Sequence, residues 1–281
     1  MLTHLRPIPP FLCFLAFYLL VFQAVVAEES AEVPAAPAAA NYTFAAYMGN
    51  GLYGTTDSSL FVLNVPTTFN LHDFHHTRLR LSTSAGFFNY GRESIEDLEL
   101  PDSIGTLTLI PGIEKTFYMS EHHHVIPHLD FGIGRDFSNG ENAQIASIGI
   151  QSRNYYSTLT SEHVWVNKLL FAGYRTLGRD IKGNYVRLLT GFDYKMPVLW
   201  SIQDHPFNPT VYTSLSWDYN GIDYLDKLQS RNPRDFIYEL GVSLYTHQPI
   251  DLWLTSVHRL GIGVQRTPFG NAIRLILGTP F

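Results

Sequence analysis

Most of the chain after residue 55 is built from stretches in which apolar and polar residues alternate. In residues 128–137, HLDFGIGRDF, the odd positions are apolar except for Arg135, and the even positions are His, Asp or Gly. The same alternation recurs in residues 78–87, 186–195, 211–219, 238–244, 259–265 and 269–281. A period of two predicts strands with one apolar and one polar face. We expect about twelve strands, counting residues 42–55 as the first, joined by turn-rich segments such as PDSIG and FSNGEN.

Two architectures share this alternation: a soluble sandwich or barrel with an apolar interior, and a membrane barrel with an apolar exterior. Three features favour the membrane barrel. The alternation lasts about nine to eleven residues per stretch, which is enough to cross a bilayer at a tilt. The polar face is rich in glycine, which a crowded lumen accommodates better than a surface exposed to water. Aromatic residues lie near strand ends, as in interfacial girdles: Tyr90, Phe137, Tyr194, Trp217, Tyr219 and Trp253.

The sequence therefore predicts an all-β fold, an antiparallel transmembrane β-barrel of about twelve strands with a short N-terminal leader. The apolar face should point toward lipid and the polar face into the lumen. A secreted, soluble, ligand-binding barrel stays the alternative, and cell fractionation separates the two.

The start of the sequence is typical of a secretory signal peptide, with an uncleaved membrane anchor as the alternative. A positively charged start precedes an apolar run from Phe11 to Val26, and small residues stand before a cleavage point after Ala27. The one cysteine, Cys13, lies in that run, so the mature chain has no disulfide. The expected domains are a signal peptide at 1–27, an Ala/Pro-rich leader at 28–55 that forms a plug or the first strand, and the barrel at 56–281.

Composition excludes one class of partner. The net charge is −6 and the chain has no cluster of Lys and Arg, so nucleic acid is not expected as a ligand. No glycine-rich phosphate loop or nucleotide motif is present, and we expect no cofactor.

Two segments resemble barrels of the autotransporter type. Residues 109–137, LIPGIEKTFYMSEHHHVIPHLDFGIGRDF, are similar to a hairpin of those barrels, and residues 260–281, LGIGVQRTPFGNAIRLILGTPF, are similar to their final hairpin. With only a leader of about 30 residues in front, the chain resembles the solitary outer-membrane autotransporter-like barrels of Gram-negative bacteria. The resemblance implies twelve strands, an outer-membrane location and no passenger domain.

The last residue, Phe281, ends a strand-like stretch. A terminal Phe after alternating apolar residues is the pattern read by the outer-membrane insertion machinery, so the resemblance implies Phe281 as an insertion signal. We expect its ring at the bilayer interface on the lipid face, and outer-membrane lipid and that machinery as partners.

No catalytic or metal site is expected. Outer-membrane lipid hydrolases place a His and a Ser together, but the nearest match here, Asp136-Phe137-Ser138-Asn139, has Asp instead of His, and a carboxylate is a poor base for serine at neutral pH. A lipid-modifying hydrolase is thus the second alternative. The clusters His122–His124 and His72, His75 and His76 are interpreted as loop histidines, because adjacent strand residues point to opposite faces.

The predicted lumen carries balanced charge. Six cationic and six anionic side chains fall on the polar face: Arg78, Arg80, Arg187, Lys195, Arg259, Arg274, Glu114, Asp130, Asp136, Asp193, Asp218 and Glu239. Because an unpaired charge away from water is costly, we expect these groups to form ion pairs across a narrow bore. The expected function is structural, anchoring, or passage of small solutes in the manner of a porin.

Overall fold

A computed structural model describes residues 47, 49–54, 59–71, 74–88, 105–137, 140–157, 161–178, 182–197, 200–202, 205–219, 234–252, 255–267 and 270–281. The expected signal peptide, its cleavage point and most of the expected leader lie outside these residues, as do the hydrolase candidate Ser138 and the strand-end residues Tyr90 and Trp253.

Long antiparallel strands make up nearly all of the described chain. They are β1 (Gly51–Gly54), β2 (Ser59–Asn70), β3 (Thr77–Phe88), β4 (Thr106–Lys115), β5 (Phe117–Tyr118), β6 (His123–Asp136), β7 (Asn142–Ser157), β8 (Glu162–Leu177), β9 (Lys182–Lys195), β10 (Trp200–Ile202), β11 (His205–Tyr219), β12 (Arg234–Leu252), β13 (Thr255–Thr267) and β14 (Gly270–Leu277). Strands β7 and β8 each have 16 residues, more than the length needed to cross a bilayer. Among the described residues, no helix is long and apolar enough to span a membrane.

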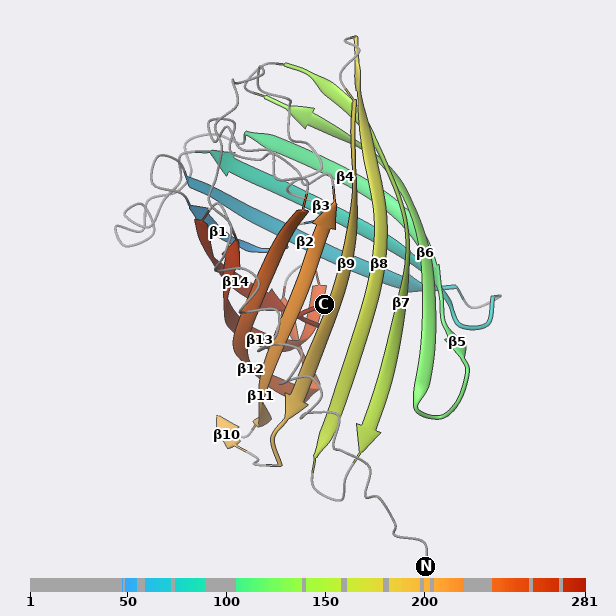
Figure 1. The fold of residues 1–281 in the computed structure, drawn as a ribbon. Helices are drawn as coiled ribbons and strands as arrows, with labels where there is room; N and C mark the ends of the chain where they lie inside the picture. The colour runs from blue at the N-terminus through green and yellow to red at the C-terminus, as the bar shows by residue number, and fades with distance from the viewer. Residues whose placement is uncertain are drawn as a thin grey trace, which may run out of the picture. The chain divides into compact units, whose positions relative to one another are not determined.

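The strands close into a barrel, shown in Figure 1. Each long strand pairs with the next long strand along the chain, β4 with β6 and β9 with β11, and the first and last strands join through the register Gly51↔Arg274 to Gly54↔Asn271. The short strands β5 and β10 only extend hairpins, so twelve strands form the ring. The predicted all-β fold and its strand number are confirmed. Strand β1 starts at Gly51, so the barrel begins inside the range expected for the leader.

The barrel has two different rims. At the first, which we name the chain-end rim, β1 begins and β14 ends, and the connections are residues 71–76, 116–122, 158–161, 196–204 and 253–254. At the second, the long-loop rim, the connections include the two longest of the barrel, residues 89–105 and 220–233.

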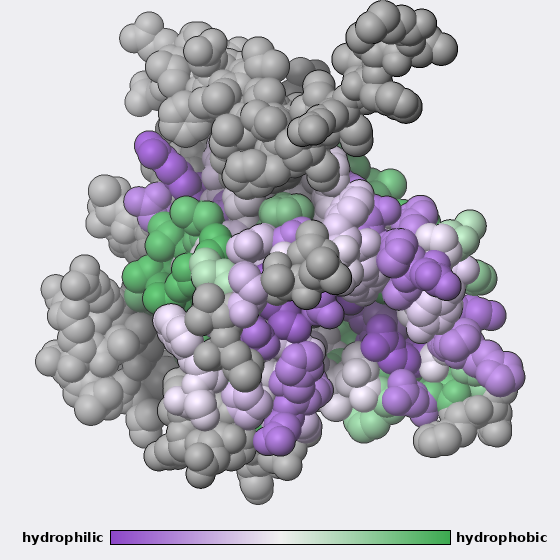
Figure 2. All heavy atoms as spheres, turned by 90° about the horizontal axis from the view of Figure 1, so that it is seen from below, coloured by the Kyte–Doolittle hydropathy of each residue, from purple (hydrophilic) through white to green (hydrophobic). Residues whose placement is uncertain are grey.

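Burial alternates along the strands with the parity that the sequence predicts. On β6, the side chains of Leu129, Phe131 and Ile133 are 56–58% exposed, whereas Asp130 and Asp136 are each 5% exposed. Large exposed apolar side chains continue around the ring on β2, β3, β4, β7, β8, β12, β13 and β14. Figure 2 shows the barrel from below the view of Figure 1, with hydrophobic residues in patches toward the left and right and hydrophilic residues around the centre and at the right edge. A soluble barrel would have the opposite arrangement, with apolar side chains filling the interior.

Glycines on the inward face make room for large side chains that cross the bore. A Cβ on Gly112 would collide with the Asp130 carboxylate, one on Gly149 with the His128 ring, and one on Gly241 with the Tyr212 ring. The glycines of the polar face are therefore explained by contacts inside the barrel. At each of these three positions, a side chain of the neighbouring strand occupies the space that a Cβ would need.

Gly241→Ala is expected to lower the free energy of unfolding by about 1–3 kcal/mol, because overpacking forces the buried Tyr212 ring to move. Tyr212 is 1% exposed and its hydroxyl is fixed by a hydrogen bond, so it has little room to shift. Urea unfolding of the folded protein in detergent, followed by tryptophan fluorescence, measures the effect. Gly173→Ala is the control, because a Cβ there comes no closer than 3.3 Å to another atom. Equal stability of the two variants would contradict the prediction.

Candidate functional site in the bore

The charged side chains that the sequence predicts on the inward face point into the bore of the barrel. All twelve lie on inward positions of their strands, and most of them take part in the ion pairs described below. Asp136 is buried at the long-loop end of β6. Lys195 pairs with a residue not included in the prediction, Glu162, at 3.0 Å.

Arg259 is the centre of the first network. Its guanidinium donates to both carboxylate oxygens of Asp193, at 2.6 and 2.7 Å, and Nε donates to Ser243 Oγ at 2.6 Å. Its Nη2 also donates to Thr210 Oγ1 at 2.5 Å. Because β11 and β12 lie between β9 and β13 in the ring, this ion pair spans the curved inner wall. A bidentate pair of this kind fixes orientation as well as charge.

Glu239 is the centre of the second network. The Tyr212 hydroxyl donates to Glu239 Oε1 at 2.7 Å, and Arg274 Nη1 donates to Glu239 Oε2 at 2.5 Å. The carboxylate is buried, and both of its oxygens have a donor. The three groups come from β12, β11 and β14, so this network links strands close to the seam where β14 pairs with β1.

Arg187 and Asp218 form a third, bidentate pair. Arg187 Nε and Nη2 donate to the two Asp218 oxygens at 2.7 and 2.6 Å. Arg187 Nη1 also donates to the backbone carbonyl of Tyr47 at 3.2 Å. The pair therefore ties the segment before β1 to the far wall of the barrel.

The fourth network is looser. Arg78 contacts Glu114 at 2.5 Å, while Arg80 Nε lies 3.5 Å from Glu114 and 3.9 Å from Asp130. The Ser147 hydroxyl donates to Asp130 Oδ2 at 2.9 Å. His128 Nε2 is 3.9 Å from the same oxygen, beyond a hydrogen bond.

The C-terminal tail enters the bore, which corrects one expectation. We expected the Phe281 ring at the bilayer interface on the lipid face. Instead, Gly278 turns the chain with a φ of 93°, and the Phe281 ring packs against the inward Gly191 and meets the Tyr212 ring edge-on at a centroid distance of 5.9 Å. Figure 1 shows the C-terminus among the strands. The physical reason is that Gly191 has no side chain, which leaves space for the Phe281 ring against the inner wall of the barrel.

The segment before β1 also lies in the bore. Tyr47 packs against Ile110, Ala143 and Ile145, a small apolar cluster on the inward face of β4 and β7. Burial raises the pKa of the Tyr47 hydroxyl to about 12. The next residues join the seam, since Asn50 accepts a hydrogen bond from Leu275 N at 3.0 Å. Two chain segments thus narrow the bore from the chain-end rim.

Between the networks lies a polar cavity of about 240 Å³. The cationic side chains on its wall are Arg80, Lys168, Arg187 and Arg274, and the anionic ones are Asp130 and Glu239. Residues of the leader and tail, Tyr47 and Phe281 among them, form part of the same wall. Sequence reasoning missed Lys168. It lies at an inward position of β8 between the buried Val166 and Leu170. Because these inward neighbours are apolar, the sequence of β8 does not show the alternation that identified the other inward charges.

The histidines on the described strands and turns gather in the half of the barrel near the chain-end rim. His75, His76, Tyr118, His124 and Tyr155 form a chain of ring contacts with centroid distances of 4.5–6.2 Å. His123 and His124 lie inside β6 rather than in a loop, and the His123 ring contacts Ser152 Oγ at 3.0 Å. Within the described ranges, no group of three His, Cys, Asp or Glu side chains could hold a metal ion.

The outward face has polar and aromatic borders. Trp165 Nε1 donates to Thr190 Oγ1, which donates to Asn167 Oδ1, both at 2.9 Å. The His163 and Tyr194 rings stack at 4.6 Å closer to the chain-end rim. Phe137 and Tyr219 are exposed near the long-loop rim. Four of the six predicted strand-end aromatic residues, including Trp217 and Tyr194, lie on described strands or at their ends.

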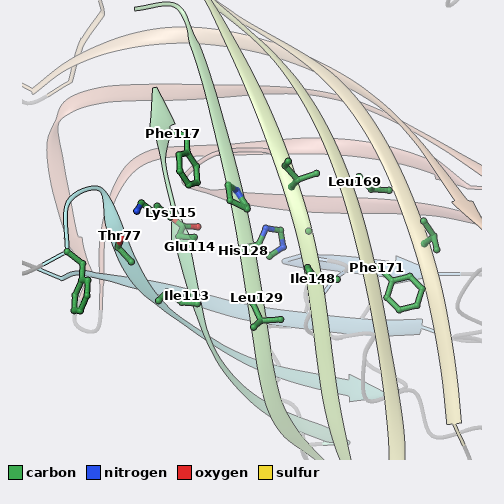
Figure 3. A pocket seen from close by; sticks show the side chains of 15 residues that line it. Thr77, Ile113, Glu114, Lys115, Phe117, His128, Leu129, Ile148, Leu169 and Phe171 are labelled. Atoms are coloured by element: carbon green, nitrogen blue, oxygen red, sulfur yellow. The ribbon is translucent and has the colours of Figure 1, made fainter. Parts of the chain in front are cut away.

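An apolar groove of about 870 Å³ lies on the outward face of β4, β6, β7 and β8. Figure 3 shows Ile113, Leu129, Ile148 and Phe171 along it, with Lys115 and Phe117 toward one end. The Lys115 ammonium lies 5.3 Å from the centroid of the Phe117 ring. The groove is part of the exposed apolar surface.

Comparisons with known proteins give little beyond this geometry. No family model matches the chain, and no curated protein matches it. Among solved structures, the crystal structure of the siderophore receptor PirA from Pseudomonas aeruginosa aligns with a TM-score of 0.33 and 11% sequence identity. The alignment covers 80% of this chain and 37% of the receptor chain, so the chain spans little more than a third of that receptor. The site is thus defined by its own residues, a charged and narrowed bore inside a closed twelve-strand barrel.

Proposed function

We propose that the chain is an outer-membrane β-barrel whose bore passes small polar solutes. One observation carries the proposal: an exposed apolar exterior surrounds an interior lined by paired charges and a polar cavity. Apolar side chains exposed all around a barrel are stable only in contact with lipid. A bore of twelve strands is intermediate in width between filled small barrels and open porins.

The height of the apolar band supports the membrane proposal. On the outward face of β7, Ser152 and Gln144 bound a run that includes Ile148 and Ile150. The eight residue steps between the two polar borders span about 27 Å along the strand, or about 20 Å in height at the usual tilt. This height is close to the band of about 25 Å found in outer-membrane barrels. The groove at Leu129 and Phe171 would then accommodate acyl chains.

The rims support an orientation. Outer-membrane barrels keep short turns at the periplasmic rim and long loops outside. We therefore place the chain-end rim, with its short connections, in the periplasm, and residues 89–105 and 220–233 on the outside.

We further propose a relation to solitary autotransporter-type barrels. The motif of residues 109–137 spans β4, β5 and β6, and the motif of residues 260–281 includes the final hairpin of β13 and β14. In both cases the motif glycines face inward, where Gly112, Gly132 and Gly261 leave no room for a Cβ. Phe281 stays the proposed insertion signal, read before its ring enters the folded bore. We propose no catalytic role for the barrel.

Planar-bilayer recordings test solute passage. The wild-type protein is expected to give small, discrete conductance steps, because the leader and tail narrow the bore. Phe281→Ala is expected to raise the conductance severalfold, because it removes the ring that lies across Gly191 and Tyr212. Phe131→Ala, on the outward face, is the control and should leave the conductance unchanged. If neither wild type nor Phe281→Ala conducts, solute passage is wrong and the barrel has a structural role.

A further inference from the structure

We propose that the cavity in the bore binds a small free oxyanion, of the phosphate or carboxylate class, on Lys168. The inference rests on the proposed function and names the class of solute that the bore accepts.

Among the cationic side chains on the cavity wall, Lys168 is the one that no described carboxylate contacts as an ion pair. The other three cationic side chains on the wall have carboxylate partners: Arg80 with Glu114 and Asp130, Arg187 with Asp218, and Arg274 with Glu239. Within the described part of the chain, no ion pair or hydrogen bond involves Lys168, although it faces the same cavity. A lysine enclosed between Val166 and Leu170, which are both buried, is costly to keep charged unless an anion compensates it.

The surroundings of Lys168 are positive. Three guanidinium groups, those of Arg80, Arg153 and Arg187, act on its ammonium group, against one carboxylate, that of Asp130. A second positive charge nearby opposes the protonated lysine, whereas an anion placed here is attracted by Lys168 and the three guanidinium groups and repelled only by the Asp130 carboxylate among the groups just named. The field in this part of the bore therefore favours a negatively charged solute.

Arg80 can supply directed hydrogen bonds to that solute. Its Nε lies at the long distances of 3.5 Å from Glu114 and 3.9 Å from Asp130. Guanidinium carries five N–H donors, so its terminal groups can bind a second anion in the fork geometry that suits phosphate and carboxylate. Lys168 would act as the point charge and Arg80 as the orienting donor.

The cavity sets the size of the solute. Its volume of about 240 Å³ equals that of about eight water molecules at about 30 Å³ each. A phosphate or a small carboxylate fits with a few waters, but an oligosaccharide does not. Hydroxyl and amide groups of Ser82, Thr68 and Asn64 on the wall can bind the remaining oxygens or those waters.

Isothermal titration calorimetry tests the site. Inorganic phosphate is titrated at low ionic strength into the folded full-length protein in an uncharged detergent. Wild type is expected to bind one phosphate saturably. Lys168→Met keeps the length of the side chain, removes its charge, and should weaken binding at least tenfold, whereas Lys168→Arg should retain it. Glu162→Gln is the control, because that carboxylate is 65% exposed and pairs with Lys195, and neither residue lines the cavity. Heat-modifiable migration in gels shows that each variant is folded.

The outcomes separate this inference from the proposed function. Phosphate binding that Lys168→Met leaves unchanged, or no binding by wild type, overturns the inference. If wild type conducts in planar bilayers but does not bind phosphate, the pore stands and the anion site is wrong. If phosphate binds through Lys168 but no conductance is seen, the anion site stands and solute passage fails. If Lys168→Met does not fold, two other variants decide. The site is supported if Lys168→Arg binds phosphate and Arg80→Gln does not. The site is contradicted if Arg80→Gln binds phosphate as tightly as wild type.

Discussion

Replacing Arg259 by methionine should lower the free energy of unfolding by about 3–5 kcal/mol, because it leaves a charge without its partner inside the protein. Arg259 is 5% exposed, and its guanidinium binds both oxygens of Asp193 and the hydroxyls of Ser243 and Thr210. Methionine retains most of the apolar volume of the side chain, so the measured loss reports mainly the charge and its hydrogen bonds.

Urea titration of the detergent-folded barrel gives the change in free energy. The control is Glu162→Gln, which breaks the Lys195 pair at a carboxylate that is 65% exposed and should cost less than about 1 kcal/mol. The double variant Arg259→Met/Asp193→Leu removes both charges and should regain more than half of the loss, since apolar replacement of a buried pair is close to neutral. A single variant as stable as the control would show that the Arg259 network contributes little.

Placing an arginine on the lipid face should be the second large effect. Ile148 lies midway between the polar borders of β7, is 57% exposed, and has Leu129 and Phe171 as cross-strand neighbours. Ile148→Arg is expected to cost about 2–4 kcal/mol in a bilayer, because the guanidinium lies near the midplane. In a soluble protein the same change at an exposed position would cost at most about 0.5 kcal/mol.

Gln144→Arg provides the matched control on the same strand and face. Gln144 stands at the border of the apolar band, where an arginine should cost only about 0–1 kcal/mol. Reversible urea unfolding from phospholipid vesicles, followed by tryptophan fluorescence, compares the two variants. If both variants are as stable as wild type, the outward face does not meet lipid, and the membrane proposal fails.

Much of the fold could be predicted because alternation is a local property. Once residues 128–137 are assigned to one strand, parity alone places Asp130 inward and Leu129 outward. The partners could not be predicted, because Arg259 and Asp193 are 66 residues apart and meet only when the ring is closed. Sequence parity therefore identified the charged face but not which groups bind each other.

The residues that sequence reasoning misplaced or missed depend on tertiary structure. Parity alone put Phe281 on the lipid face, but the left-handed Gly278 ends the strand before it and sends the tail inward. Lys168 was missed because its inward neighbours Val166 and Leu170 are apolar, so β8 shows no clear alternation. Both belong to the cavity wall, the part of the barrel that chain segments from several strands build together.

The closing seam has a consequence for how the barrel forms. Its four residue pairs join positions more than 200 residues apart, whereas β7 and β8 form a local hairpin of sixteen pairs. High contact order of this kind slows folding. Until the final strand docks, the growing sheet keeps two unpaired edges, which are templates for aggregation. This topology therefore predicts a slow closing step, during which aggregation at the open edges competes with the docking of β14 against β1.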